Sequence, residues 1–416
     1  MQQDGNLLIQ NAQLFGESGL SDLYIVAGKY SGSSAKYPRK MQTIDANGRL
    51  CVPGFIEPHV HLDKSFSIDY LSQNETGSLE EAVGLLTSTQ KTREPLSSEM
   101  TIEKAALMAL SSGVTQIRSH VDIDPNVGLN AVERLLKIKK KLESVIDIQI
   151  VAFPQQGILR KNGMKKLLAD ALEAGANVVG GIPAFEANIT DSRKHVEAIF
   201  EIAINLNRDI DMHIDESDSA SSTTLELLCE ATLQNNYQGR VTASHACALS
   251  AYDDRYAGKI IDMVVAAEIG VIVNPATNLM LQGRSSTYPK ARGLTRVDEL
   301  TQKGVIVAFG QDNIQDMFYP FGQMDPLDLA FLLAHGAHMN KPADPDLLLK
   351  MATFNSAKII RTSNYGFNEG DNADLVILNA FSAHEAVCAR PDRAYVVKSG
   401  RVVVETEKRS LKFNYL

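Results

Sequence analysis

The amino-acid sequence predicts a (β/α)8 barrel, the TIM-barrel architecture, together with a small β-sandwich domain built from both termini. Two patterns lead to this α/β fold class. The middle of the chain alternates short β-branched runs with segments of helical period, and eight such runs occur. The two ends of the chain instead carry short strand-like runs separated by turn residues. Alternation of strand and helix predicts a parallel sheet, and eight strands are the number that closes this barrel.

The eight barrel strands are assigned from apolar, β-branched runs bounded by loops. The first run lies within residues 53–64, and the others lie at residues 114–121, 147–153, 177–182, 209–214, 240–245, 271–274 and 305–310. Helical segments between them often end at a glycine just before the next strand, as at Gly113 and Gly175, and glycine is a common helix stop. A doubly wound open sheet is the competing fold, but no glycine-rich phosphate loop follows the first strand.

The two ends of the chain show the same pattern of short strand-like runs and are expected to form one domain. Strand-like runs occur at residues 7–9, 22–26 and 42–45 near the N-terminus, and at residues 373–378 and 394–404 near the C-terminus. Two β-rich ends that flank a different middle favour one shared domain over separate packing of each end on the barrel. The expected division is residues 1–52 and 362–416 for the β domain and residues 53–361 for the (β/α)8 barrel.

Composition restricts the partners of this protein. At 416 residues the chain fits one large barrel and one smaller domain. Its net charge of -9 at pH 7 and the absence of a long basic run argue against binding of nucleic acid or of an anionic membrane. No apolar stretch is long enough for a membrane span, the first residues do not resemble a signal peptide, and the four cysteines show no C-x-x-C motif. We therefore expect a cytoplasmic protein with reduced thiols.

Histidines and carboxylates gather at the predicted carboxyl ends of the barrel strands. His59 and His61 alternate at the end of the first strand, so both side chains lie on one face. The other strand ends carry, in chain order, His120, Asp122, Gln155, His213, Asp215, Glu216, His245, Asn274 and Asp312. The carboxyl ends of the strands meet at one mouth of such a barrel. A single histidine is more often structural, but a set of this size indicates a functional site.

Part of this set can bind one divalent ion. The imidazoles of His59, His61 and His213 and the carboxylate of Asp312 are donors that suit Zn(II) or Fe(II). A position would stay open for water, whose pKa falls when it binds such an ion.

The neighbouring residues can supply the proton transfers. Asp312 and His245 can orient the water, and Glu216 is the expected proton shuttle because it lies where the strand gives way to a loop. One ion is favoured over two, since no bridging lysine is evident at a strand end. Lys64 and Asp122 nevertheless leave a two-metal site open.

Several stretches of the sequence carry a family pattern. They are Pro-Gly-Phe-Ile-Glu-Pro-His-Val-His at 53–61, His-Ile-Asp-Glu at 213–216, Ser-His at 244–245 and Gly-Gln-Asp at 310–312. These stretches resemble the amidohydrolase superfamily. Further stretches, at residues 118–122, 151–159, 180–186, 281–284, 288–296, 319–322 and 372–378, are similar to the bacterial cytosine deaminase branch. The similarity runs through the whole barrel and into the terminal strands.

The resemblance implies roles for individual residues. It assigns His59, His61, His213 and Asp312 as the ligands of one divalent metal ion. It makes Glu216 the proton shuttle and His245 the residue that helps to orient the hydrolytic water. Gln155, in Phe-Pro-Gln, matches the glutamine that reads the amide-like edge of the pyrimidine ring. The resemblance is also compatible with a homo-oligomer.

Two pocket positions depart from the cytosine deaminase pattern, and both are expected to contact the substrate. Where that branch has a second aspartate after the metal-binding one, this chain has Asn313; where it has a tryptophan before Tyr-Pro, this chain has Phe318. A polar mismatch in a buried pocket costs about 1–3 kcal/mol, so such a change can redirect specificity. Asp312-Asn313-Ile314 and the run from His61 to Phe66 are also similar to the isopropylammelide aminohydrolase branch, which acts on s-triazine rings.

The sequence therefore predicts a metal-dependent hydrolytic deaminase that acts on a small aminoazine such as cytosine and releases ammonia. The alternatives are an s-triazine aminohydrolase of the N-alkylammelide type and a deaminase of another cyclic amidine, such as isocytosine or creatinine. Hydrolysis of a cyclic amide is a further possibility, typically with two metal ions. A non-catalytic barrel is disfavoured, because all four expected metal ligands are present.

Overall fold

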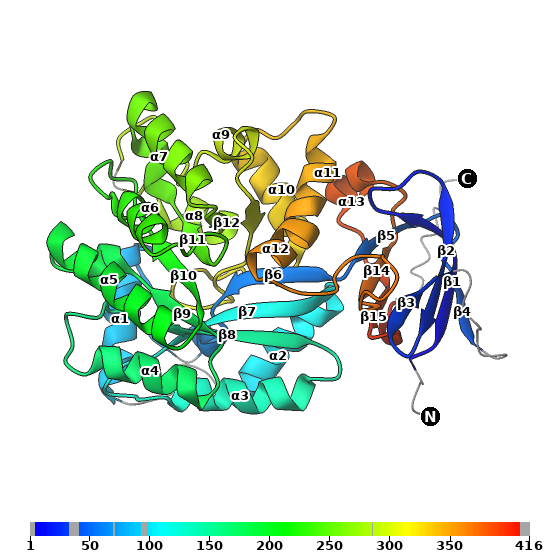
Figure 1. The fold of residues 1–416 in the computed structure, drawn as a ribbon, viewed down its shortest axis with the longest axis horizontal. Coiled ribbons are helices and arrows are strands. Elements are labelled where there is room, and N and C mark those ends of the chain that lie inside the picture. Colours follow the sequence, from blue (N-terminus) through cyan, green and yellow to red (C-terminus); the bar gives the residue numbers. More distant parts are fainter. Residues whose placement is uncertain (1–4, 33–40, 70, 93–97, 285, 408–416) are drawn as a thin grey trace.

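The computed structural model describes residues 5–32, 41–69, 71–92, 98–284 and 286–407 of the chain. A barrel with surrounding helices forms the larger part, and a separate sheet built from both ends of the chain lies beside it (Figure 1). Both parts of the fold class predicted from the sequence are confirmed. The predicted β domain also includes residues 1–4, 33–40 and 408–416, which lie outside the described residues.

Eight parallel strands form the barrel sheet, in the same order as in the chain. They are β6 (Phe55–Val60), β7 (Val114–Asp122), β8 (Asp147–Phe153), β9 (Val178–Gly181), β10 (Asp209–Ile214), β11 (Val241–His245), β12 (Gly270–Val273) and β13 (Val307–Phe309). The first and last strands meet just beyond their ends: His61 N donates to Asp312 O, and Asp312 N donates to His59 O, both at 2.8 Å. The His-x-His pair and Asp312 are therefore neighbours, although more than 250 residues separate them in the chain.

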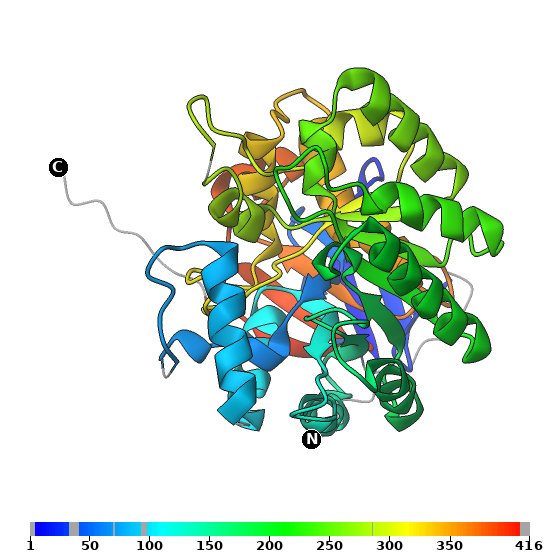
Figure 2. The same cartoon turned by 90° about the vertical axis from the view of Figure 1, so that its left-hand side faces the viewer.

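Helices surround the barrel sheet (Figures 1 and 2). They are α1 (Leu79–Thr92), α2 (Glu99–Ser111), α3 (Asn130–Leu142), α4 (Met164–Ala174), α5 (Ile189–Asn205), α6 (Thr224–Gln234), α7 (Asp254–Ala266), α8 (Pro275–Leu281), α9 (Val297–Gln302), α10 (Pro326–Gly336), α11 (Asp344–Lys350) and α12 (Ser356–Ile359). Gly113 and Gly175 follow α2 and α4 with φ of 86° and 127°. Side chains other than glycine rarely adopt such angles, which explains the helix stops expected there.

The terminal strands form one mixed sheet in the order β16-β15-β14-β5-β1-β2-β3, with β4 paired to β1. These strands are β1 (Leu7–Leu14), β2 (Leu20–Val26), β3 (Lys29–Ser31), β4 (Gln42–Asp45), β5 (Leu50–Pro53), β14 (Leu375–Leu378), β15 (Arg393–Lys398) and β16 (Arg401–Glu405). The antiparallel pairing of β5 with β14 joins the two ends of the chain. The precise division at residues 52/53 and 361/362 stays a prediction.

The alternation of strands and helices did not predict helix α1 or helix α13 (Ala383–Ala389). Helix α1 matters for the site, because Ala82 and Leu86 are fully buried in an apolar cluster with Leu281, Met317 and Phe318. The loops after β12 and β13 thus pack against a helix that is inserted between β6 and β7.

Two observations bear on the expected environment of the protein. Within the described part of the chain, no helix combines the length and apolar character that crossing a membrane requires. All four cysteines are free, and three of them are buried.

Candidate metal centre and its surroundings

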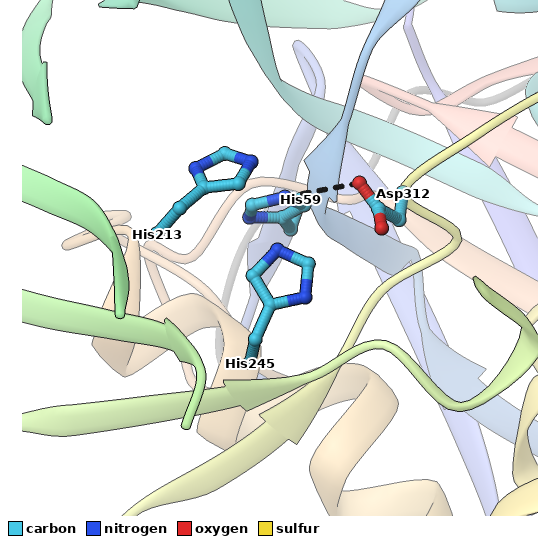
Figure 3. Close-up of side chains that lie close together, drawn as sticks. All are labelled: His59, His213, His245 and Asp312. Atoms are coloured by element: carbon cyan, nitrogen blue, oxygen red, sulfur yellow. Dashed lines mark ion pairs between the residues drawn. The ribbon is translucent and has the colours of Figure 1, made fainter. Parts of the chain in front are cut away.

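Donor atoms from four different parts of the chain converge at the carboxyl ends of the barrel strands. His59 lies on β6, His213 on β10 and His245 at the end of β11, while Asp312 follows β13. Their donor atoms lie within 4.8 Å of one another, and all four side chains are buried. Figure 3 shows the three imidazoles gathered around one centre with the Asp312 carboxylate beside them.

His61 completes this cluster. Its Nε2 lies 3.1 Å from His213 Nε2 and 3.4 Å from Asp312 Oδ1, and His59 Nε2 lies 3.3 Å from the same oxygen. Ligands that bind one ion at roughly 2.0–2.2 Å stand about 2.8–3.6 Å apart at octahedral or tetrahedral angles. These three spacings are those expected of ligands around a single divalent ion.

The protonation states also fit a metal centre. Burial lowers the pKa of His59, His61 and His213, so these imidazoles are neutral near pH 7 and keep a lone pair. Burial would raise the pKa of Asp312, but the surrounding histidines outweigh burial and hold that pKa well below its usual range. Neutral imidazole and ionised carboxylate are the forms in which these groups bind metals.

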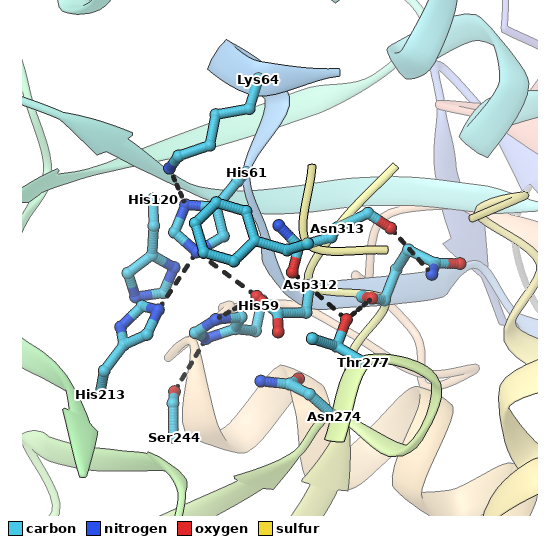
Figure 4. Close-up of polar contacts among 12 residues, drawn as sticks. His59, His61, Lys64, His120, His213, Ser244, Asn274, Thr277, Asp312 and Asn313 are labelled. Carbon is cyan, nitrogen blue, oxygen red and sulfur yellow. Dashed lines mark hydrogen bonds and ion pairs between the residues drawn. The ribbon is translucent and has the colours of Figure 1, made fainter. Parts of the chain in front are cut away.

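Lys64 forms a buried ion pair beside the cluster. Its Nζ lies 2.8 Å from Asp122 Oδ1 and 3.0 Å from His61 Nδ1 (Figure 4 shows the second contact). Burial alone would lower the pKa of Lys64, but Asp122 and Asp63 outweigh it and raise that pKa. Lys64 is therefore an ammonium group and not a bridging ligand. Its charge beside His61 disfavours a second cation there.

Glu216 lies beside the cluster on the loop that follows β10. Asn278 Nδ2, from α8, donates to Glu216 Oε1 at 3.0 Å, and His245 Nδ1 lies 3.5 Å from the same oxygen. Burial raises the pKa of Glu216 to about 7. Near neutral pH this carboxyl is therefore populated both with and without its proton, as a proton shuttle requires.

Asp215, the other carboxylate at this strand end, has a structural role. It accepts hydrogen bonds from Thr224 N and Leu225 N, both at 2.9 Å, and so caps the first turn of α6. Asp215, His245 and Asp312 all have positive φ, at 47°, 72° and 66°. Such angles cost residues other than glycine about 1–3 kcal/mol and cluster at functional sites. The turn at Asp215 directs its own side chain to α6 and leaves Glu216 at the cluster.

The side of the pocket that is expected to bind the substrate ring begins at the end of β8. The Phe153 ring stacks on the His213 imidazole, with ring centroids 4.1 Å apart and planes 21° apart. Gln155 follows two residues later and is 7% exposed. The structure thus brings the segment that carries Gln155 next to the cluster.

Asn313 and Phe318, both expected to contact the substrate, make several contacts with other residues of the protein. Asn313 Nδ2 donates to Asp316 Oδ2 at 2.8 Å. Asn313 Oδ1 accepts from Thr277 Oγ1 at 3.3 Å (Figure 4). Phe318 is buried with Met317 and the residues of α1. It also lines a pocket of about 330 Å³ with Asp316 and Met317.

Sequence reasoning gave no role to several polar residues that lie behind the cluster. His59, His120 and Asp211 form a second buried group whose donor atoms lie within 4.8 Å of one another. Burial would raise the pKa of Asp211, but His120 and Arg118 outweigh burial and keep the carboxylate ionised. Alternation could have identified Asp211, because it precedes His213 by two residues on β10 and faces the same side. Asn278 had no such signal, because it lies on a helix.

Comparison with known sequences agrees with the family pattern. A model of the amidohydrolase family matches residues 42–404. N-isopropylammelide isopropyl amidohydrolase of Pseudomonas sp. (strain ADP) is 30% identical over 416 residues, which cover 98% of this chain and 99% of that protein. Pterin deaminase of Rhizobium rhizogenes is 28% identical over 373 residues, which cover 88% of this chain and 83% of that protein.

Solved structures extend the comparison to the fold. A 5-methylcytosine deaminase from Klebsiella pneumoniae, liganded with phosphonocytosine, has a TM-score of 0.92 and 35% identity, covering 97% of this chain and 100% of its own. N-isopropylammelide isopropylaminohydrolase from Burkholderia multivorans has a TM-score of 0.82 and 31% identity, covering 96% and 98%. Because the family model and these relatives span nearly the whole chain, this protein belongs to the amidohydrolase family and is a hydrolase that acts on carbon–nitrogen bonds.

Proposed function

We propose that this protein is a metal-dependent hydrolytic deaminase of a small aminoazine ring, with a pyrimidine such as cytosine as the first candidate. The observation that carries the proposal is the position of Glu216. It is a carboxyl only 13% exposed with a pKa raised to about 7, and it lies 3.5 Å from His245 beside the histidine and aspartate cluster. Hydrolytic deamination needs a group that takes a proton from water and gives one to the ring.

The residues proposed to hold the ion are His59, His61, His213 and Asp312. Their imidazole and carboxylate donors suit Zn(II) and Fe(II), so either ion is compatible with the site. When bound, such an ion acts as a Lewis acid that lowers the pKa of water and so provides a nucleophile near neutral pH. The spacings of 3.1–3.4 Å between the donor atoms support this assignment.

The side chains around the ion site would move and hold the protons. Glu216 takes a proton from the attacking water and delivers it to the ring nitrogen next to the carbon that bears the amine. Glu216 then passes the remaining hydroxyl proton to the amine, the carbon–nitrogen bond breaks as the carbonyl forms, and ammonia leaves. His245 and Asp312 orient the water, and Asn278 contacts His245 Nδ1 at 3.1 Å, which fixes the imidazole in place.

The opposite wall would select the ring. We propose that Gln155 reads the amide-like edge of the substrate. Asn313 shapes the wall: its amide nitrogen donates one of its two hydrogens to Asp316, and its amide oxygen accepts from Thr277. Phe318 sets the apolar side of the pocket through its packing with α1.

The names of three relatives support an aminoazine substrate. The proteins named for 5-methylcytosine, pterin and N-isopropylammelide all concern nitrogen heterocycles. The TM-score of 0.92 to the 5-methylcytosine deaminase, against 0.82 to the N-isopropylammelide enzyme, favours a pyrimidine as the first candidate.

A substrate panel tests the proposal. Metal-replete protein is assayed for ammonia release from cytosine, 5-methylcytosine, isocytosine, creatinine and ammelide, with metal-free protein as the control. We expect the highest kcat/KM for cytosine or 5-methylcytosine and no ammonia from the metal-free protein. Absence of turnover on every ring would contradict the deaminase assignment, and bound metal without turnover would favour a non-catalytic barrel.

An s-triazine aminohydrolase is the second candidate. The observation that favours it is the 30% identity to the Pseudomonas enzyme along 98% of this chain. The same cluster and Glu216 would serve both reactions, so only the substrate wall separates them. Release of isopropylamine from N-isopropylammelide, with a kcat/KM above that for cytosine, would select this alternative.

A further inference from the structure

A line of hydrogen bonds runs behind His59, away from the proposed ion. Ser244 Oγ, on β11, lies 2.9 Å from His59 Nδ1 (Figure 4) and 2.8 Å from Asp211 Oδ1, on β10. The other oxygen of Asp211, Oδ2, accepts a hydrogen bond from Arg118 Nη1 at 2.9 Å. All four side chains are at most 1% exposed, so water does not compete for these contacts.

The chemistry of these groups fixes the direction of each hydrogen bond. The Arg118 guanidinium can only donate, and the Asp211 carboxylate paired with it can only accept. The single hydroxyl hydrogen of Ser244 therefore points to Asp211, since two oxygens 2.8 Å apart need a hydrogen between them. Ser244 then offers only lone pairs to His59, so His59 Nδ1 must carry the hydrogen of the neutral ring.

We propose that Ser244 and Asp211 are positioning residues that hold His59 as the tautomer with its hydrogen on Nδ1 and its lone pair on Nε2. This inference rests on the proposed metal centre. His59 Nε2 lies 3.3 Å from Asp312 Oδ1 and is buried with no hydrogen-bond partner among the described residues, as an unprotonated nitrogen would be. The partner of a ligand histidine sets its tautomer, and losing that partner costs about 10–100-fold in metal affinity.

The second histidine of the pair has a different partner. His61 Nδ1 lies 3.0 Å from Lys64 Nζ, which is a donor and not an acceptor. The line through Ser244 therefore presets the lone pair of His59 on Nε2, whereas Lys64 favours the opposite tautomer of metal-free His61, with its hydrogen on Nε2.

The variant Asp211→Asn should reverse the direction of the hydrogen bonds made by Ser244, because asparagine has nearly the same size and shape as aspartate. Arg118 requires an acceptor, so the new amide oxygen faces the guanidinium and the amide nitrogen faces Ser244. Ser244 then accepts from this nitrogen and turns its own hydrogen toward His59 Nδ1. The hydrogen of His59 must consequently move to Nε2.

Nitrogen chemical shifts of ¹⁵N-histidine-labelled, metal-free protein report this change directly, with a His59→Gln spectrum to identify the signals. We expect His59 to be protonated on Nδ1 in the wild type and on Nε2 in Asp211→Asn. The same tautomer in both proteins would overturn the proposal. The measurement uses neither metal nor turnover, so its outcome is independent of the deaminase assignment.

Ser244→Ala provides the second test, because it removes the hydroxyl and leaves the Asp211–Arg118 ion pair in place. Zinc affinity is measured by competition with a chelator. We expect a loss of about 10–100-fold in Ser244→Ala, with most of the affinity recovered in Ser244→Thr, which restores a hydroxyl. Ser192→Ala is the matched control, because Ser192 is also buried but donates to Pro183 O, away from the cluster.

Unchanged zinc affinity in Ser244→Ala would overturn the proposal. An equal loss in Ser192→Ala would do the same, because it would indicate a general packing effect. Failure of the wild-type protein to bind zinc would count against the proposed metal centre, and the tautomer measurement would still decide the role of Asp211.

Discussion

The metal-facing side and the ring-facing side of the pocket are built in different ways. On the metal-facing side, the four proposed ligands lie at or next to the carboxyl ends of strands, and the register of the parallel sheet determines which side chains face inward. On the ring-facing side, Asn313 and Phe318 lie on the loop after β13. Their positions depend on Thr277, Asp316 and helix α1.

The metal-facing side should therefore determine the type of reaction, and the ring-facing side should determine which substrate is bound. Strand ends hold the donor atoms and the base in a rigid frame, which is the condition for binding an ion and moving a proton. The loop after β13 can be rebuilt without disturbing that frame. Changes on the metal-facing side should therefore affect kcat or stability strongly, and changes on the ring-facing side should be smaller.

The largest effect is expected for Glu216→Gln. Glutamine keeps the shape and can still accept from Asn278, but it cannot take up a proton. We expect kcat for ammonia release to fall by about 10²–10⁴-fold while the bound metal, measured by atomic absorption, stays at the wild-type level. Glu201→Gln, an exposed glutamate paired with Lys165, is the control and should behave as the wild type. Full activity in Glu216→Gln would remove Glu216 from the mechanism.

The pH profile follows from the same residue. Glu216 acts first as a base, so it must be ionised, and burial raises its pKa to about 7. We expect kcat/KM to rise with pH along an acidic limb at or below pH 7, because a bound cation favours the carboxylate. That limb should disappear in the residual activity of Glu216→Gln.

Lys64→Met should give the largest loss of stability on the metal-facing side. It leaves Asp122 buried without its cationic partner, and the cost of such a change is about 3 kcal/mol or more. The pKa of Asp122, already raised to about 7 by burial, would rise further above its unfolded value. The penalty should therefore be small at low pH and grow as pH rises through that pKa.

Urea unfolding of the metal-free protein at pH 5 and pH 8 measures this loss. The double variant Lys64→Met/Asp122→Asn should recover most of the stability, since it removes the unpaired carboxylate. Equal losses at both pH values would show that packing and not charge explains the effect.

Asn313→Asp is expected to have a smaller, pH-dependent effect. It places a second carboxylate 2.8 Å from Asp316, whose pKa burial already raises to about 6. The shared proton raises the folded-state pKa further, so stability is kept at low pH and lost as pH rises. We expect a loss of about 1–3 kcal/mol at pH 8 and little loss at or below about pH 4, the pKa of an unfolded aspartate. Reversing the pair in Asn313→Asp/Asp316→Asn should restore stability, and a pH-independent loss would contradict this explanation.

The smallest effect is expected for Phe318→Leu. Phe318 packs with Met317 and α1 in an apolar cluster. We expect a change in KM that alters kcat/KM by less than about tenfold, with kcat preserved. Steady-state kinetics on the best substrate of the panel measures it. A thousandfold loss of kcat would place Phe318 at the reacting atoms. It would contradict the expectation that changes on the ring-facing side leave kcat intact.

The metal-facing side could be predicted from the sequence because simple periodicities determine it. His59 and His61 alternate on a strand, and the barrel pattern places His213, His245 and Asp312 at the same mouth. The register of a parallel sheet leaves little freedom for these side chains. The eight strands and the shared terminal sheet were predictable for the same reason.

The ring-facing side could not be predicted to the same extent. Nothing local in the sequence indicates that Asn313 would be shared between Thr277 and Asp316, because those contacts depend on how two loops meet. The packing of Phe318 against α1 is a long-range contact of the same kind. Ser244 was visible in the sequence only as the neighbour of His245, and its role required the distances to His59 and Asp211.

Titration of metal into metal-free protein, with ammonia release as the readout, tests the one-metal deaminase most directly. The best substrate of the panel is used, and Zn(II) and Fe(II) are added in separate series. The proposed centre predicts that activity rises in proportion to added metal and reaches a plateau at one equivalent per chain. A plateau at two equivalents, or no ammonia at any metal content, would contradict it.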